Sequence, residues 1–409
     1  MSRPRPRTLA LGALALILCA TPFVPRGGDD DNGAITPSGQ AAARPAATAG
    51  FGTLTPEAQA EIDRVLAQGA SVSASTSARR SPEALAAGLA RCAEFEGQRY
   101  CLGSGWTQDT PAEVQARVAA SARAATTTGR RVPVEQTGDL DAAALLERTA
   151  ALPAAERAEL ERAELTMAAR SVAKVWLLRH EIQGEPLPDG FLERHPEAQA
   201  DGTPATTART AAVGRQSGPA DYPEKAVIMR PGRVSSQNRT YWCGPTSMQM
   251  IAWGWTGTKS SQGGWARKLG TTTSGSSIWD MVRVTNESTG WDRKSHAGPY
   301  VVLDIGDWSY REWKTLLMRH LADYRAPVVL HPILLERFYP YLDDDASGHF
   351  QVGRGYTRRP GKPVKISYFE PWNQQRFDPS EPYIERVQWR AAYKSYRGNL
   401  AHHQHNIGV

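Results

Sequence analysis

The chain has 409 residues, with 48 Lys and Arg against 42 Asp and Glu, so its formal net charge at pH 7 is +6. This excess is small for the length and no basic arm is present, which argues against a nucleic-acid-binding protein. A weak affinity for anionic cell-wall polymers stays open. Beyond the N-terminus no run reaches the ~18 apolar residues of a membrane helix, so we expect no stable membrane insertion.

The first residues are typical of an export signal. Arginines precede a short apolar run from Leu9 to Ala20, and such a run is too brief to span a bilayer. We therefore predict a signal peptide at 1–24 and a secreted, extracellular protein. Residues 25–50 are rich in Gly, Ala, Pro and Asp, which predicts a disordered linker.

Three cysteines remain after the predicted signal: Cys92, Cys101 and Cys243. Gly97 lets the chain turn back between the first two, so in an oxidising compartment a local disulfide is expected. Two buried thiols are the alternative. With that pair joined, Cys243 is left alone, and an unpaired cysteine in an exported protein is a liability unless its thiol is used.

Residues 51–200 are expected to form a mostly helical region. Hydroxyl residues stand before proline at Thr55, Ser81 and Thr110, as at the N-cap of a helix, and Glu113 completes a capping box with the third of them. A longer helix is predicted over 153–182. Its residues Leu165, Ala168, Val172 and Trp176 share one face at helical spacing.

A second linker is predicted at 201–223, followed by an α+β domain at 224–409. Apolar runs at 326–330, 349–353 and 364–369 are typical of strands. Helical spacing of apolar residues follows Cys243, and Pro245 fits the first turn of that helix. We expect this one helix, then the strands, then a last helix near 381–400.

The stretch QNRTYWCGPTSMQMI (237–251) places Cys243 at the start of that helix. Free backbone N–H groups and the helix dipole favour a thiolate over a thiol there. Gly244 keeps the approach to the sulfur open. The amide of Gln237 is a candidate donor to the oxygen of a carbonyl that the sulfur attacks.

A thiolate nucleophile needs a base, and His349 in SGHFQVGRGY is the best placed histidine, at the end of a predicted strand. A base is itself oriented by a third group. Glu370, which ends the strand ISYF, is expected to accept the Nδ1 proton of His349, and Trp372 to shield that contact. Asn373 is the alternative orienting residue, and a solvent-exposed Glu370 is the alternative without catalytic meaning.

The order of Gln237, Cys243-Gly244-Pro245, Gly348-His349 and Glu370-Pro371 resembles the C39-like cysteine peptidases, from about residue 220 to the end. The resemblance implies a papain-like α+β fold, in which a cysteine heads a helix packed on a small antiparallel sheet. It also implies Cys243 as nucleophile, His349 as general base and Gln237 as oxyanion donor. The family commonly has aspartate where this chain has Glu370.

The sequence thus predicts an exported cysteine peptidase or amide hydrolase acting on a peptide or protein substrate through Cys243, His349, Glu370 and Gln237. Gln237 and the backbone N–H of Cys243 are expected to stabilise the oxyanion. Two alternatives stay open. One is an acyl transferase using the same residues, and the other is an inactive papain-like protein that binds peptides or cell wall. No cofactor or metal is expected, because the histidines of HHQH (402–405) lack nearby carboxylate or cysteine ligands. Whether 51–200 is a propeptide or an accessory module, which bond is cut, and the oligomeric state stay undecided.

Overall fold

The computed structural model of the chain describes the following residues: 52–70, 81–128, 137–198, 216–289, 299–339, 342, 345–359, 364–372, 386–397 and 405–409. They all belong to one unit, Gly33–Val409. The predicted signal peptide, the linker 25–50, residues 201–215 of the second predicted linker and Asn373 lie outside this set. Within it, no helix combines the length and apolar composition that crossing a membrane takes.

The first helices begin where the capping residues predict. Their bounds are α1 Pro56–Gly69, α3 Pro82–Leu89 and α4 Pro111–Thr128. The side-chain oxygens of Thr55 and Ser81 each accept a first-turn backbone N–H. Thr110 and Glu113 make both hydrogen bonds of the capping box. Local side-chain chemistry therefore fixes these helix starts, as predicted.

The predicted long helix is confirmed. The remaining helical segments of this region are α5 Ala142–Ala151, α6 Ala154–Leu178 with a π-helical turn Arg179–Gln183, α7 Phe191–Arg194 and a 3-10 turn Pro196–Ala198. On α6, Leu165, Ala168 and Val172 are buried, while Trp176 is only half-buried. The apolar face that the sequence shows is thus the face that packs.

A three-stranded antiparallel meander interrupts these helices, a feature that the prediction of a mostly helical region omits. Its strands are β1 Cys92–Phe95, β2 Gln98–Cys101 and β3 Gly105–Thr107. Cys92 and Cys101 stand opposite each other in the β1–β2 register and form the predicted disulfide. The turn between them uses positive φ angles at Glu96 and Gly97, +49° and +80°, which suits a tight hairpin.

Within the described residues, ten strands form one sheet in the order β1-β2-β3-β5-β10-β6-β7-β8-β9, with β4 paired to β7. The further strands are β4 Lys225–Val227, β5 Val302–Asp304, β6 Val328–Leu330, β7 Gln351–Thr357, β8 Lys365–Phe369, β9 Arg386–Gln388 and β10 Asn406–Gly408. Neighbouring strands are antiparallel except β3 and β5, which pair in parallel through Trp106 and Leu303. The fold is therefore mixed α/β with a mostly antiparallel sheet, consistent with the predicted α+β class.

The C-terminal half holds more helices than predicted. They are α8 Cys243–Thr256, α9 Gln262–Leu269, α10 Ile278–Thr289, α11 Tyr310–Ala322 and α13 Trp389–Arg397, with 3-10 turns at Pro219–Asp221 and Pro231–Arg233. The expectation of a single helix before the strands is wrong, because α9, α10 and α11 intervene. Ser309 and Glu312 form a capping box at the start of α11, so the sequence did carry a signal for that helix.

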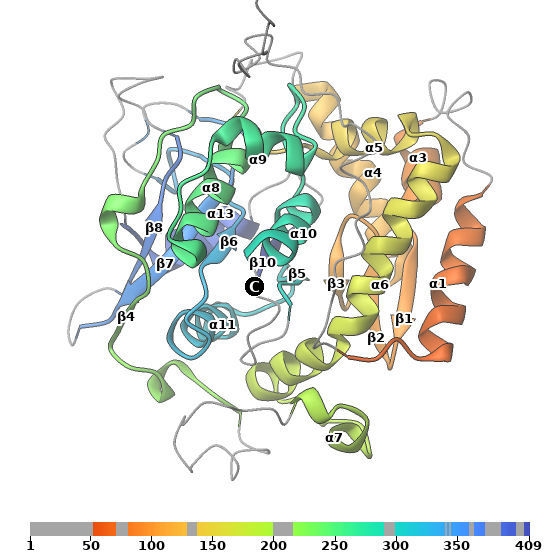
Figure 1. Cartoon of the computed structure of the whole chain (residues 1–409), viewed down its shortest axis with the longest axis horizontal. Helices are drawn as coiled ribbons and strands as arrows, with labels where there is room; N and C mark the ends of the chain where they lie inside the picture. The colour runs from red at the N-terminus through yellow and green to blue at the C-terminus, as the bar shows by residue number, and fades with distance from the viewer. Residues whose placement is uncertain are drawn as a thin grey trace, which may run out of the picture. The chain divides into compact units, whose positions relative to one another are not determined.

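Helix α8 is the element that places the site. Its first ten residues are all buried, and its apolar side chains share a core with Phe350 and Val352 around β7. Figure 1 shows α8 beside β7 and α9, and α1 and α6 alongside β1. The cysteine that begins α8 is therefore held between the helix layer and the sheet.

Candidate active site

Cys243 is the free cysteine of the described chain, and its side chain is fully buried. Burial raises the pKa of this thiol well above its usual value, and the Asp139 carboxylate acts in the same direction, whereas a hydrogen bond to the Phe350 backbone opposes both. The expectation that the helix start favours a thiolate does not hold in this arrangement. Removal of the sulfur from water outweighs the helix N-terminus.

His349 and Glu370 form the predicted pair, but through the other ring nitrogen. His349 Nε2 lies 2.5 Å from Glu370 Oε1, and both side chains are completely buried. Glu370 also accepts from Gln351 Nε2 at 2.6 Å and from the Trp372 backbone N–H at 2.7 Å. These two donors fix the carboxylate where it meets Nε2, so the predicted bond through Nδ1 is wrong.

This pairing leaves Nδ1 of His349 available. Because an ionised carboxylate only accepts hydrogen bonds, the Nε2–H of His349 is the donor to Glu370, and Nδ1 carries the lone pair. Nδ1 is buried and has no hydrogen-bond partner among the described residues. A buried acceptor without a partner is rare in folded proteins. It is the property that a general base requires before its reaction.

Two predicted oxyanion donors meet at one oxygen. The backbone N–H of Cys243 donates to the carbonyl oxygen of Thr137 at 3.1 Å, and Gln237 Nε2 donates to the same oxygen at 3.3 Å. Gln237 is fully buried, and its Nε2 also lies 3.0 Å from the Arg239 carbonyl oxygen and 2.6 Å from that of Thr240, so the two amide hydrogens are shared among three acceptors. The groups named from the sequence thus surround a carbonyl as an oxyanion hole would.

The carbonyl in that position comes from residues 137–140, which no sequence pattern indicated. Thr137 Oγ1 donates to the carbonyl oxygen of Gly348 at 2.7 Å, and the Thr137 N–H donates to Ser347 Oγ at 3.0 Å. The Ser276 N–H donates to the Gly138 carbonyl, and the Leu140 N–H to the Ser276 carbonyl, each at 2.9 Å. This segment therefore joins the cysteine and histidine sides of the site.

A second buried histidine lies nearby, with both ring nitrogens engaged. His331 Nε2 is 2.7 Å from Asp139 Oδ2, and its Nδ1 is 2.8 Å from Asn406 Oδ1. The ring stacks on Phe350, with centroids 4.6 Å apart. Since neither nitrogen of His331 is left to exchange a proton with a thiol, the geometry favours His349 as the base.

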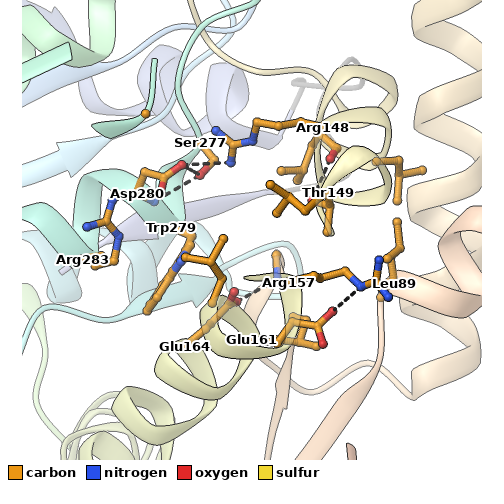
Figure 2. Close-up of a pocket in the computed structure, with 18 of the residues that line it drawn as sticks. Leu89, Arg148, Thr149, Arg157, Glu161, Glu164, Ser277, Trp279, Asp280 and Arg283 are labelled. Carbon is orange, nitrogen blue, oxygen red and sulfur yellow. Dashed lines mark hydrogen bonds and ion pairs between the residues drawn. The ribbon is translucent and has the colours of Figure 1, made fainter. Parts of the chain in front are cut away.

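A cavity of the described chain lies elsewhere. It measures about 140 Å³ and is lined by helices α3 to α6 on one side and by α9 and α10 on the other. Figure 2 shows Arg148 and Ser277 hydrogen-bonded to the Asp280 carboxylate. Glu164 also faces the cavity. None of the four predicted catalytic residues is among those that line this cavity.

A thiol at a helix start, a histidine with one free nitrogen, and two N–H groups on one carbonyl oxygen all serve attack on an acyl carbon. Cysteine peptidases use groups of these kinds. In the comparison with protein families, residues 233–399 match the Peptidase_C39 like family, which supports a C39-like peptidase assignment for this part of the chain. The match includes Gln237, Cys243, His349 and Glu370 and excludes the segment 137–140. Comparisons with curated proteins and with solved structures gave no match.

Proposed function

We propose that the protein is an exported cysteine peptidase or amide hydrolase in which Cys243, His349, Glu370 and Gln237 form the catalytic site. The observation that carries this proposal is the meeting of the Cys243 N–H and the Gln237 amide on one carbonyl oxygen. Both donors are the ones that the sequence predicts for the oxyanion. The packing of α8 against β7 of an antiparallel sheet supports the papain-like arrangement.

The reaction follows from these positions. Nδ1 of His349 takes the thiol proton, and the sulfur of Cys243 attacks the acyl carbon of a bound peptide. The oxyanion is held by the Cys243 N–H and the Gln237 amide. His349 then gives the proton to the leaving nitrogen, the amine departs, and a thioester remains. Water, deprotonated by His349, cleaves the thioester, which releases a carboxylic acid and restores the thiol.

Glu370 acts on this cycle through His349. It keeps Nε2 protonated and so directs the lone pair of Nδ1 to the reaction, and it stabilises the imidazolium once Nδ1 is protonated. Its own position is secured by Gln351 and Trp372. The longer side chain compared with the family's usual aspartate is therefore accommodated by a full set of hydrogen bonds.

The test compares alkylation of Cys243 by iodoacetamide from pH 5 to 9 in the full chain and in His349→Ala, with the modified peptide located by mass spectrometry. How often the sulfur becomes exposed affects the alkylation rates of the wild type and of His349→Ala equally. The ratio of the two rates therefore measures the effect of the His349 imidazole on the thiol. We expect His349→Ala to react at least ~10-fold more slowly near pH 6, because alkylation takes place only in molecules whose sulfur has become exposed, and there a histidine-paired thiolate persists well below the ordinary pKa of ~8.5. His180→Ala, outside the family segment, is the matched control and should react like the wild type. Equal rates in all three proteins would refute the catalytic pair.

Hydrolysis is measured in parallel on a mixture of synthetic peptides, with products read by mass spectrometry. Gln237→Ala should lower turnover by about 10²–10³-fold, the usual effect of losing one oxyanion donor. Cys243→Ala should abolish it. Turnover that survives in Cys243→Ala would assign the cleavage to another site.

A further inference from the structure

The segment 137–140, here called the plug, occupies the site in the manner of a peptide ligand. Its Thr137 carbonyl takes the two oxyanion donors, Cys243 N–H and Gln237 Nε2. Its backbone also pairs with Ser276 through one accepted and one donated hydrogen bond, both at 2.9 Å. Main-chain pairing of an extended segment with an exposed edge is a common way for proteins to bind peptides.

The plug is fitted to the site at the level of the backbone. Gly138 has a φ of +107°, and a Cβ there would lie 2.1 Å from the carbonyl oxygen of Tyr241. A Cβ on Gly275, on the opposite side, would lie 2.0 Å from the Gly138 carbonyl oxygen. Two glycines therefore let the plug lie directly between the main chain before Cys243 and the loop before α10.

With the plug in place the site is closed. The side chains of Cys243, His349 and Gln237 have no exposed surface, and residues 137–140 are themselves buried. Thr137 bonds both to the residue before His349 and to the backbone of Cys243. No substrate carbonyl can reach the oxyanion donors while the Thr137 carbonyl is bound to them.

We propose that residues 137–140 are a built-in inhibitor of the acyl site, bound in the place of a substrate carbonyl and left uncut, so that the peptidase is latent until this segment is displaced. The proposal rests on the proposed function and adds its regulation. It assigns a purpose to part of the N-terminal half, which lies outside the family segment 233–399.

The plug also contains a group that protects it from cleavage by Cys243. Its Asp139 carboxylate pairs with His331, and together with burial it raises the pKa of the Cys243 thiol. A protonated thiol is a poor nucleophile. While the plug is bound, the sulfur is therefore held in the form that does not attack the Thr137 carbonyl.

The test uses Gly138→Val in the full chain. Valine would overlap the backbone of Tyr241 and is strained at this φ, so the plug must leave the site. We expect Cys243 to react with iodoacetamide at least ~10-fold faster than in the wild type. Keeping the overlapping valine in the closed site would cost more free energy than a ~10-fold change in the closed-to-open equilibrium represents. Gly232→Val is the matched control, since a Cβ at Gly232 meets no atom within 4 Å. It should leave the rate unchanged.

Two further measurements separate a displaced plug from a damaged fold. An acetylated and amidated Thr-Gly-Asp-Leu peptide, added in excess, should slow alkylation of Gly138→Val, which an unfolded chain would not allow. Thr137→Val removes the bond to Gly348 with little change of shape, and should raise the rate by about 5-fold. If Gly138→Val does not fold, the alkylation rate of Thr137→Val tests the proposal instead.

Three results would overturn the proposal. They are an unchanged alkylation rate in both plug variants, failure of the peptide to protect folded Gly138→Val, and cleavage of the wild-type chain between Thr137 and Gly138 seen by intact mass. A different result would show that the proposed catalytic function itself is wrong. In that case Gly138→Val reacts faster, but adding His349→Ala to it leaves the pH profile unchanged.

Discussion

Glu164 offers a sharp test of how burial controls the stability of this protein. It lies on α6 at the cavity of Figure 2, where Tyr100 Oη and the Gly103 N–H donate to its Oε1 at 3.0 and 2.8 Å. Burial raises the pKa of Glu164 from 4.5 to about 7. The two hydrogen bonds oppose this rise, and the Glu161 and Asp280 carboxylates add to it.

The sign of the effect follows from proton uptake. Because the folded pKa lies above the unfolded one, the native state binds more protons between pH 4.5 and about 7. The contribution of Glu164 to stability is therefore fully present below pH 4.5 and is lost as the pH rises through 7. At about 1.4 kcal/mol per pH unit, the loss amounts to about 3 kcal/mol above pH 8.

Glu164→Gln removes this penalty because the amide oxygen still accepts from Tyr100 and Gly103 and carries no charge. We expect the variant to match the wild type near pH 4.5 and to exceed it by about 3 kcal/mol at pH 8. Urea unfolding followed by tryptophan fluorescence at pH 5, 6.5 and 8 gives the difference in free energy of unfolding. Glu159→Gln, an exposed position on the same helix, should show no such gain. A difference that is flat with pH would refute the reasoning.

Three further predictions concern the disulfide, a helix cap and the charge beside the thiol. The double variant Cys92→Ala/Cys101→Ala should lose about 2–3 kcal/mol in urea unfolding, as expected for a short closed loop, and reductant should cost the wild type a similar amount. Ser309→Ala should cost about 1 kcal/mol of unfolding free energy, since its side chain caps α11, and an unchanged midpoint would count against that cap. Asp139→Asn should lower the pKa of the Cys243 thiol, because the carboxylate raises it. The pH profile of Cys243 alkylation in this variant should then shift to lower pH. An unshifted profile would show that the Asp139 carboxylate does not raise the thiol pKa.

Local chemistry explains what could be predicted from the sequence. Thr55 and Ser81 cap helices within one turn, and Pro245 fits only an early helical position, so short windows of sequence contain the information. His349 and Glu370 could be matched because His349 shortly precedes β7 and Glu370 directly follows its antiparallel neighbour β8, which brings the two to the same end of the strand pair. The ring nitrogen that meets Glu370 was missed, since Gln351 and Trp372 set the carboxylate's position in space.

The missed features depend on contacts between distant residues. Strands β5 and β10 have three residues each, too few to show a period of two. The plug binds through the backbone of Thr137 and Gly138, and main-chain atoms leave no signature in side-chain patterns. Its contact with Ser347 spans 210 positions. Only the folded chain brings these segments together.

The parallel pair of β3 and β5 limits how the site can open. Trp106 of β3 pairs with Leu303 of β5, and Thr107 and Arg117 both bind the Asp304 carboxylate. Removing the N-terminal half would leave β5 as a bare edge strand, which proteins avoid. Activation is then expected to release the plug while its region stays attached. A tethered plug rebinds at an effective concentration on the order of mM. A substrate must therefore compete for the site with a ligand present at that local concentration. Activity would then be graded by competition and would not require loss of a propeptide.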